Sequence, residues 1–171
     1  MTRNLVRFYG QGDLHFLTFS CYRRLPFLGT SGARNEFVSA LAEIRKRHSF
    51  SLIGYVVMPE HVHLLITESP ASSPSVVVKV LKHRARRRIH AQETILSLHV
   101  QSARTDLRTA FWTPRFHDRN IRGSHFWREK LDYMHRNPVK RGLVQNPADW
   151  PWSSYSNYEA IPSALIPIDF I

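Results

Sequence analysis

The sequence has very little cysteine. Cys21 is the only cysteine among 171 residues, so no disulfide can form within the chain and no cluster of thiolates can bind a metal. A lone cysteine is typical of a reducing compartment. Any metal site must therefore use histidine, carboxylate or amide ligands.

Long apolar runs are also absent. The opening residues, MTRNLVRFYGQGD, contain no apolar segment like that of an export signal. Nowhere do roughly 18 apolar residues follow one another, as a membrane span requires. We therefore expect a soluble protein that is not exported and has no membrane partner.

Acidic residues are scarce as well. The chain has 13 Asp and Glu against 24 Lys and Arg, which leaves a formal net charge of +11 with neutral histidines. This excess favours a polyanionic partner. A hydrophobic content of 43% can fill one core at this length. We predict a single domain over residues 1–171, with its core at about 12–145 and an aromatic tail at about 146–171.

Apolar periodicity and Gly/Pro punctuation divide the chain into seven elements. Four segments have strand composition: 14–21, 51–58, 61–67 and 111–121, the last at an edge or with a bulge because of Pro114. Three have helical spacing: 33–48, a helix capped by Ser75 with an apolar stripe from Val77 to Ile89, and a helix from Ser124 to near Pro138. Residues 92–110 give mixed signals and receive no assignment.

The order β-α-β-β-α-β followed by a helix is that of the ferredoxin-like split βαβ arrangement. In this α+β fold two crossover helices cover one face of an antiparallel sheet. The helix from Ser124 and the aromatic segment DWPWSSYSNY are available to cover the other face. We expect a site between that face and the last helix, although a fold alone does not determine a function.

His61 and His63 are two residues apart on a predicted strand, so both side chains project from one face. Val62 projects from the opposite face, which should pack under the crossover helices. The two imidazoles can therefore offer two nitrogens to one ion. A purely hydrogen-bonding role for both histidines fits the spacing equally well.

Tyr133 and Asn137 are four residues apart, which places them on one face of the last helix. A nucleophile and a third metal ligand can share that face. His135 points elsewhere and is assigned to DNA contact or packing. The alternative is that Tyr133 is a packing residue and Asn137 only ends the helix before Pro138.

A cluster of cations occupies the predicted helix that starts at Ser75. It consists of Lys79, Lys82, Arg84, Arg86, Arg87 and Arg88. No acidic residue lies among them, so pairing within the helix does not explain the cluster, and phosphate neutralisation is its natural use. Further cations extend this basic surface towards the proposed site: Arg115, Arg119, Arg122, Lys140 and Arg141. A solvated basic face is the alternative. Trp150, Trp152 and Tyr155 can stack on bases, although core packing suits tryptophan better.

Four segments together resemble a known family. They are YVVMPEHVHLLITE, FHDRNI, KLDYMHRNPVKRGLV and DWPWSSY, and they span about residues 12 to 158. This combination resembles the one-tyrosine HUH transposases of the IS200-like superfamily, most closely the REP-associated tyrosine transposase group. Glu60 departs from the pattern, because such proteins usually have Asn there.

The resemblance implies specific roles. His61 and His63 would be metal ligands, Asn137 would complete the site, and Tyr133 would be the nucleophile of a single-strand DNA endonuclease and strand transferase with a 5′-phosphotyrosine intermediate. The implied cofactor is Mg²⁺ or Mn²⁺, and the implied partner is single-stranded or hairpin DNA at repetitive palindromes. We expect a monomer or homodimer in the bacterial cytoplasm, associated with the nucleoid.

Two other functions remain open from the residues. One is a DNA-binding module or repressor on the same fold with a vestigial metal site, which is motivated by Glu60. The other is a metal-dependent phosphohydrolase that uses water and forms no bond between protein and DNA. The three hypotheses differ in whether Tyr133 becomes covalently attached to DNA.

Overall fold

The fold is built on a four-stranded antiparallel sheet with the order β2-β3-β1-β4. The computed structural model describes residues 9–99, 110–162 and 164–171. The strands are β1 (Leu14–Ser20), β2 (Leu52–Val57), β3 (His61–Thr67) and β4 (His117–Ile121). A helix connects each central strand to an edge strand that runs in the same direction without pairing with it, β1 to β2 and β3 to β4, as in the split βαβ arrangement. The predicted α+β fold class is confirmed.

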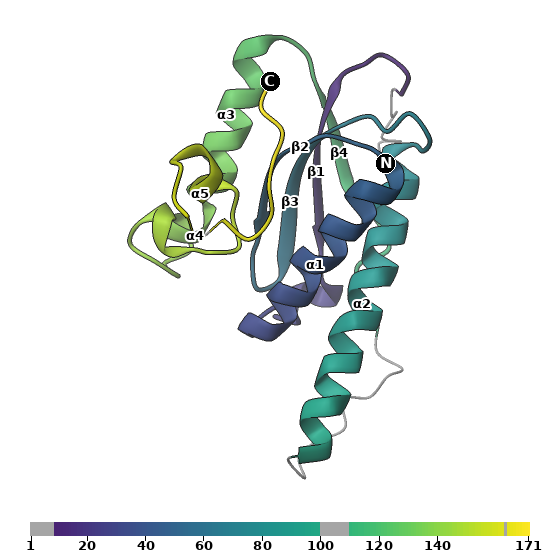
Figure 1. Cartoon of the computed structure of the whole chain (residues 1–171), viewed down its shortest axis with the longest axis vertical. Helices are drawn as coiled ribbons and strands as arrows, with labels where there is room; N and C mark the ends of the chain where they lie inside the picture. Colours follow the sequence, from purple (N-terminus) through teal and green to yellow (C-terminus); the bar gives the residue numbers. More distant parts are fainter. Residues whose placement is uncertain (1–8, 100–109, 163) are drawn as a thin grey trace.

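One face of the sheet is covered by two long helices, α1 (Ser31–His48) and α2 (Pro74–His99), which lie side by side (Figure 1). The Thr30 hydroxyl caps α1 by accepting a hydrogen bond from the Ala33 amide at 3.1 Å. Val62, Leu64 and Ile66 of β3 belong to the core under these helices, as the sequence pattern predicted. The lower end of α2 extends beyond the sheet in Figure 1.

The other face is covered by α3 (Ser124–His135) and by the segment that follows it. That segment contains α4 (Asn137–Lys140), the short 3-10 helix η2 (Pro147–Asp149) and α5 (Tyr155–Tyr158). Trp127, Leu131 and Met134 form the second core with residues of β1, β2 and β3. Trp150 is buried in this core and donates to the Val57 carbonyl at 3.1 Å, so it packs rather than stacks on bases.

Gly54 allows α3 to lie close against β2. A Cβ at this position would lie 2.5 Å from Leu131 Cδ1 and 3.3 Å from Ser154 Oγ. Two carbon atoms of different residues essentially never approach to 2.5 Å, because their electron shells repel, so any larger residue here would force Leu131 to shift in a tightly packed interior. The close contact holds α3, and with it Tyr133, at a fixed height above the sheet.

Several predicted boundaries differ from the structure. Helix α1 begins at Ser31 rather than at residue 33, and α3 ends at His135, so that Asn137 belongs to α4. Helix α2 begins at Pro74 rather than after Ser75, because Ser73 takes the capping position and its carbonyl accepts the Val76 and Val77 amides. The same helix continues to His99, through part of the unassigned segment; residues 100–109 lie outside the described residues. The fourth strand is shorter than predicted, since the residues before His117 contribute only an isolated bridge between Trp112 and Cys21.

The short 3-10 helix η1 (Tyr22–Arg24) follows β1 and places Arg24 near the start of β3. None of the described helices combines the length and the apolar character that a bilayer span requires.

Candidate active site

The two histidines of β3 face each other on the side of the sheet that α3 covers. Their Nε2 atoms are 3.2 Å apart, and each residue is 5% exposed. The ring of Phe16 stacks on that of His63, with centroids 5.3 Å apart. The pair is therefore held rigidly, with one nitrogen of each ring turned inward.

The outer nitrogens of both rings are hydrogen bonded. His61 Nδ1 donates to Glu60 Oε1 at 3.1 Å, since a carboxylate can only accept. His63 Nδ1 lies 2.7 Å from Thr18 Oγ1 on the neighbouring strand. Such second partners fix the tautomer and orientation of histidines that bind metals. His61 Nε2 is consequently unprotonated, and its lone pair points inward.

Burial lowers the pKa of both histidines below the ordinary value of 6.5. For His63 the pKa falls to about 3, because burial and then the neighbouring charges of His61 and Arg24 disfavour the imidazolium. For His61 burial outweighs the opposing attraction of Glu60. Both rings are neutral at physiological pH, which is the form that coordinates metal ions.

Asn137 joins the histidine pair from the start of α4. Its Nδ2 lies 3.2 Å from His63 Nε2, and the side chain is buried. The amide nitrogen donates to His63 Nε2, so this nitrogen carries a lone pair that points inward beside that of His61. A half-turn of the amide exchanges nitrogen for oxygen at the same point, so Asn137 can supply an oxygen ligand when a cation is bound.

This arrangement fits a divalent cation. Two nitrogens bound to one ion at about 2.1 Å, with an angle between tetrahedral and octahedral values, lie about 3.0 to 3.4 Å apart. The observed separation of 3.2 Å falls within this range. Within the described ranges no group of three or more His, Cys, Asp and Glu residues is placed to hold a metal. A cation held at this point would be bound by two imidazoles and one amide.

Tyr133 lies beside the histidine pair. Its ring meets that of His63 edge to face at a centroid distance of 5.6 Å, and the residue is 43% exposed. The Lys140 ammonium lies 5.1 Å from the centre of the same ring. Over the described residues the Tyr133 hydroxyl makes no hydrogen bond, so it is available to a substrate. The predicted convergence of Tyr133, Asn137 and both histidines occurs within one chain.

A groove of about 520 Å³ opens between α3 and the edge strand β4 at this point. Tyr133 and His63 line one part of it, and the sheet supplies Phe16 and Thr18. Its cationic side chains are Arg119 of β4 and Lys130 of α3, and β4 also contributes His117 and Asp118 to the lining. A polyanionic strand can therefore pass along the groove and reach Tyr133.

The predicted role of the cations on α2 requires correction. Lys82 is buried and its ammonium donates to the carbonyls of Thr113 at 2.8 Å and Arg115 at 3.3 Å, while burial lowers its pKa to about 8. It anchors the segment before β4, and the prediction that it contacts DNA is wrong.

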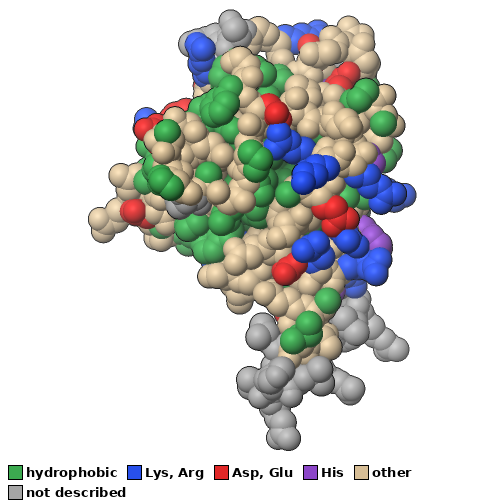
Figure 2. Space-filling view, in the orientation of Figure 1, with side chains coloured by type: hydrophobic (Ala, Val, Ile, Leu, Met, Phe, Trp, Pro, Cys, Tyr) green, Lys and Arg blue, Asp and Glu red, His purple; other side chains and the backbone are tan. Residues whose placement is uncertain are grey.

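The basic cluster also has acidic partners, and these do not belong to its own helix. Arg84 pairs with Glu43 at 2.9 Å, and Arg88 pairs with Glu36 at 2.8 Å and with Glu43 at 3.3 Å. Both acids belong to α1, and Figure 2 shows red and blue side chains side by side over the two helices. Lys79 and Arg87 are exposed and Arg86 is half-buried, but α2 covers the face of the sheet opposite the histidines.

The remaining predicted cations have different environments. Arg115 and Arg119 are exposed near β4. Arg122 pairs with Asp13 at 2.9 Å, although the guanidinium is largely exposed. Arg141 pairs with Glu60 at 2.8 Å, so it ties the chain after α4 to the start of β3. Lys140 lies against Tyr133.

Some residues of the site were missed from the sequence. Thr18 contacts His63 because the two residues are partners in the β1–β3 register. Lys130 lies three residues before Tyr133, a helical spacing that could have revealed it. Glu60 was noted only as a departure from the family pattern. Its Oε1 accepts hydrogen bonds from His61 and Arg141 and, at 3.5 Å, from Arg24.

The fold and the histidine pair define a class of protein. Residues 9–125 match the family model described as "Transposase IS200 like". The chain belongs to this family and is an enzyme that acts on DNA. The matched range contains the histidine pair, whereas Tyr133 and Asn137 follow it.

Relatives match nearly the whole chain. A REP-associated tyrosine transposase of Escherichia coli is 28% identical over 96% of this chain and 88% of its own length. A Haemophilus influenzae protein with the same group name is 27% identical over 98% of this chain and 92% of its own. The structure of a REP-associated tyrosine transposase bound to a REP hairpin superposes with a TM-score of 0.71 and 27% identity, over 97% of this chain and 89% of the other.

Proposed function

We propose that this protein cleaves and rejoins single-stranded DNA at hairpins, with Tyr133 as the nucleophile and a divalent ion held by His61, His63 and Asn137. The observation that carries the proposal is the meeting of two inward imidazole nitrogens, the Asn137 amide and the Tyr133 ring at one point. A relative of known structure binds a REP hairpin, which supports hairpin DNA as the substrate class. Such a substrate places the protein at the nucleoid.

The chemical step is a transfer of the phosphodiester to Tyr133. The phenolic oxygen forms a bond to phosphorus while the bond from phosphorus to the 3′ oxygen breaks. The phenolic proton leaves, and the departing 3′ oxygen takes up a proton. The products are a 5′-phosphotyrosine and a 3′-hydroxyl, and attack by a 3′-hydroxyl in the reverse direction rejoins the strand.

Each residue of the site has a distinct part in this step. When bound, Mg²⁺ or Mn²⁺ supplies charge stabilisation at the phosphate oxygens. Asn137 and the two histidines hold and orient that ion, while Glu60 and Thr18 keep the imidazoles in position. The Lys140 ammonium beside the Tyr133 ring stabilises the negative charge that develops as the phenol loses its proton. Manganese suits a set of two nitrogens and one oxygen better than magnesium does.

The test is the formation of a covalent adduct. The protein is incubated with Mn²⁺ and a panel of labelled single-stranded hairpins with unpaired flanks, and products are separated on a denaturing gel. We expect a protein–DNA adduct that disappears in Tyr133→Phe and persists in Tyr22→Phe, which removes a hydroxyl from η1. An undiminished adduct in Tyr133→Phe, or no adduct with any hairpin, contradicts the proposal.

The same experiment separates the other functions. A water-based phosphohydrolase would cut the hairpin without an adduct, and Tyr133→Phe would remain active. A repressor would bind the hairpin in every variant and cut in none. Mass spectrometry of a tryptic digest should find DNA attached to Tyr133 only if the protein is the proposed strand transferase.

A further inference from the structure

A second pocket lies on the opposite side of α3 from the groove. It has a volume of about 690 Å³, opens to solvent and is lined by residues of α3, α4, η2 and α5 and of the segments between them. Arg128 and Asp132 of α3 and Arg136, which directly follows this helix, line the pocket, while Tyr133 and Lys130 line the groove. Pockets of this size, roughly 300 to 1,000 Å³, are typical of small-molecule sites.

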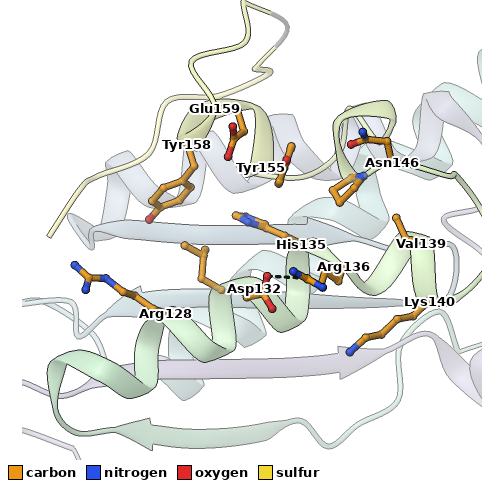
Figure 3. A pocket seen from close by; sticks show the side chains of 12 residues that line it. Arg128, Asp132, His135, Arg136, Val139, Lys140, Asn146, Tyr155, Tyr158 and Glu159 are labelled. Carbon is orange, nitrogen blue, oxygen red and sulfur yellow. Dashed lines mark hydrogen bonds and ion pairs between the residues drawn. The ribbon is translucent and has the colours of Figure 1, made fainter.

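One wall of this pocket is aromatic. Tyr155 and Tyr158 descend from α5 towards α3 (Figure 3), and Tyr155 meets the His135 ring edge to face at 5.5 Å. His135 is itself fixed by a hydrogen bond of 2.8 Å between its Nε2 and Ser154 Oγ. Tyr158 is held by its hydroxyl, which donates to the Ile53 carbonyl at 2.9 Å. The wall is a rigid surface for a flat ring.

The rim of the pocket is cationic. Arg128 and Lys140 lie at its two ends, and neither pairs with a carboxylate of the described residues. Arg136 pairs with Asp132 at 2.8 Å (Figure 3), and Glu159 is the remaining acid. Two uncompensated cations beside an aromatic wall suit a ligand that combines a planar ring with phosphate.

Lys140 of the pocket contacts Tyr133 of the groove. Lys140 places its ammonium 5.1 Å from the centre of the Tyr133 ring. Arg136, on the pocket rim, directly precedes Asn137 of the histidine cluster. A strand whose phosphodiester lies at Tyr133 can therefore continue past Lys140 into the pocket.

We propose that the pocket binds one unpaired nucleotide of the DNA strand, adjacent to the phosphodiester presented to Tyr133. Its base stacks on the Tyr155 wall, and its phosphates contact Lys140 and Arg128. The inference rests on the proposed function of the Tyr133 site. Stacking on an aromatic side chain tolerates any base, so this contact holds the strand in place without selecting a sequence.

Crosslinking tests the position of the strand. The Tyr133→Phe protein, without metal, is irradiated with a short oligothymidylate that carries one 5-iodouracil, and crosslinked peptides are mapped by mass spectrometry. We expect crosslinks at Tyr155 or Tyr158. Crosslinks confined to the groove or to α2 overturn the proposal. Because the assay needs no cleavage, its result is independent of whether Tyr133 is a nucleophile.

Binding measurements test the stacking. Fluorescence anisotropy should show that Tyr155→Ala weakens oligothymidylate binding roughly five- to hundredfold, while Tyr155→Phe binds like the parent. An abasic oligomer of equal length should bind Tyr155→Ala and the parent protein with the same affinity. Arg128→Ala should weaken binding more than Arg47→Ala, which removes the same charge from α1. Equal losses on the abasic oligomer, or thymidine monophosphate binding as tightly as the oligomer, overturn the assignment to a nucleotide of the strand.

Discussion

Two buried histidine clusters stand on the same sheet and have opposite chemistry. His15 of β1 lies on the α1/α2 side, with Nδ1 2.7 Å from Asp118 Oδ1 and Nε2 3.1 Å from Glu68 Oε1. His61 and His63 of β3 lie on the α3 side, and carboxylate or hydroxyl partners reach only their outer nitrogens. The first cluster is closed by acids, and the second is open to a ligand.

The partners, and not burial, account for this difference. Burial is the largest single influence on His15 and lowers its pKa, but the hydrogen bonds and charges of Asp118 and Glu68 together outweigh it and leave the pKa above 6.5. His63 faces no carboxylate, so burial lowers its pKa to about 3. A fully paired imidazolium stabilises the fold, whereas an unpaired neutral imidazole offers a lone pair to a cation.

The largest expected effect is on catalysis at the open cluster. His63→Ala should slow adduct formation roughly a hundredfold to ten-thousandfold, because charge stabilisation by a bound metal is worth several kcal/mol. Hairpin affinity and the circular dichroism spectrum should change little. His15→Gln, assayed well below its melting temperature, should retain the parent rate. Full Mn²⁺-dependent activity in His63→Ala would show that the histidine pair is not the metal site.

The next effect is on stability at the closed cluster. His15→Gln should lower the free energy of unfolding at about pH 6 by about 3 to 5 kcal/mol, because it leaves the buried Asp118 carboxylate without its cation. Urea denaturation measures this loss. In the double variant with Asp118→Asn the loss should be smaller than the sum of the two single losses. Strict additivity would mean that the two side chains do not interact.

The same variant has a predictable dependence on pH. The folded pKa of His15 is raised above the unfolded value of 6.5, so its contribution is fully present below about pH 6.5 and is lost as the pH rises through the folded pKa. The stability difference between the parent and His15→Gln should therefore shrink from about pH 6 towards pH 9. A difference that grows over this range would contradict the assigned ion pairs.

A further prediction concerns Glu60, which links the open cluster to its surroundings. Glu60→Gln keeps an acceptor for His61 but removes the charge that also holds Arg141 and Arg24. We expect the Mn²⁺ concentration for half-maximal adduct formation to rise roughly ten- to a hundredfold, as for other partners of metal-binding histidines. Glu129→Gln, on the exposed side of α3, serves as the matched control. An unchanged Mn²⁺ requirement would limit Glu60 to a structural role.

Local patterns predicted much of this architecture. The alternation in β3 placed Val62 under the helices and both histidines on the other face. Tyr133 and Asn137 were predicted on one helix face, but they belong to α3 and α4, and each contacts His63. The contact between Thr18 and His63 depends on the β1–β3 register, which pairs residues 45 positions apart. Such long-range pairings are not encoded in the periodicity of either strand.

The basic cluster on α2 is a clearer example of a long-range contact that local patterns do not predict. No acid lies between residues 79 and 88 of that helix, so pairing within the helix does not explain Arg84 and Arg88, and the pattern predicts a phosphate-binding face. Packing of α1 against α2 then brings Glu36 and Glu43 to them. Charge counted along one helix therefore overstates what is available to DNA, and the cations of the groove become the better candidates.

The smallest expected effect compares these two sets of cations. Arg119 is exposed in the groove with Tyr133, whereas Arg88 is paired on the opposite face. Arg119→Ala should weaken binding of single-stranded DNA several-fold and reduce the slope of log affinity against log salt by about 0.7, the value for one lost phosphate contact. Arg88→Ala should leave that slope unchanged and lower stability by less than about 1 kcal/mol, since its ion pairs are partly exposed. If instead Arg88→Ala reduced the slope as much as Arg119→Ala, DNA would have to contact α2, and the path of the strand along the groove would be wrong.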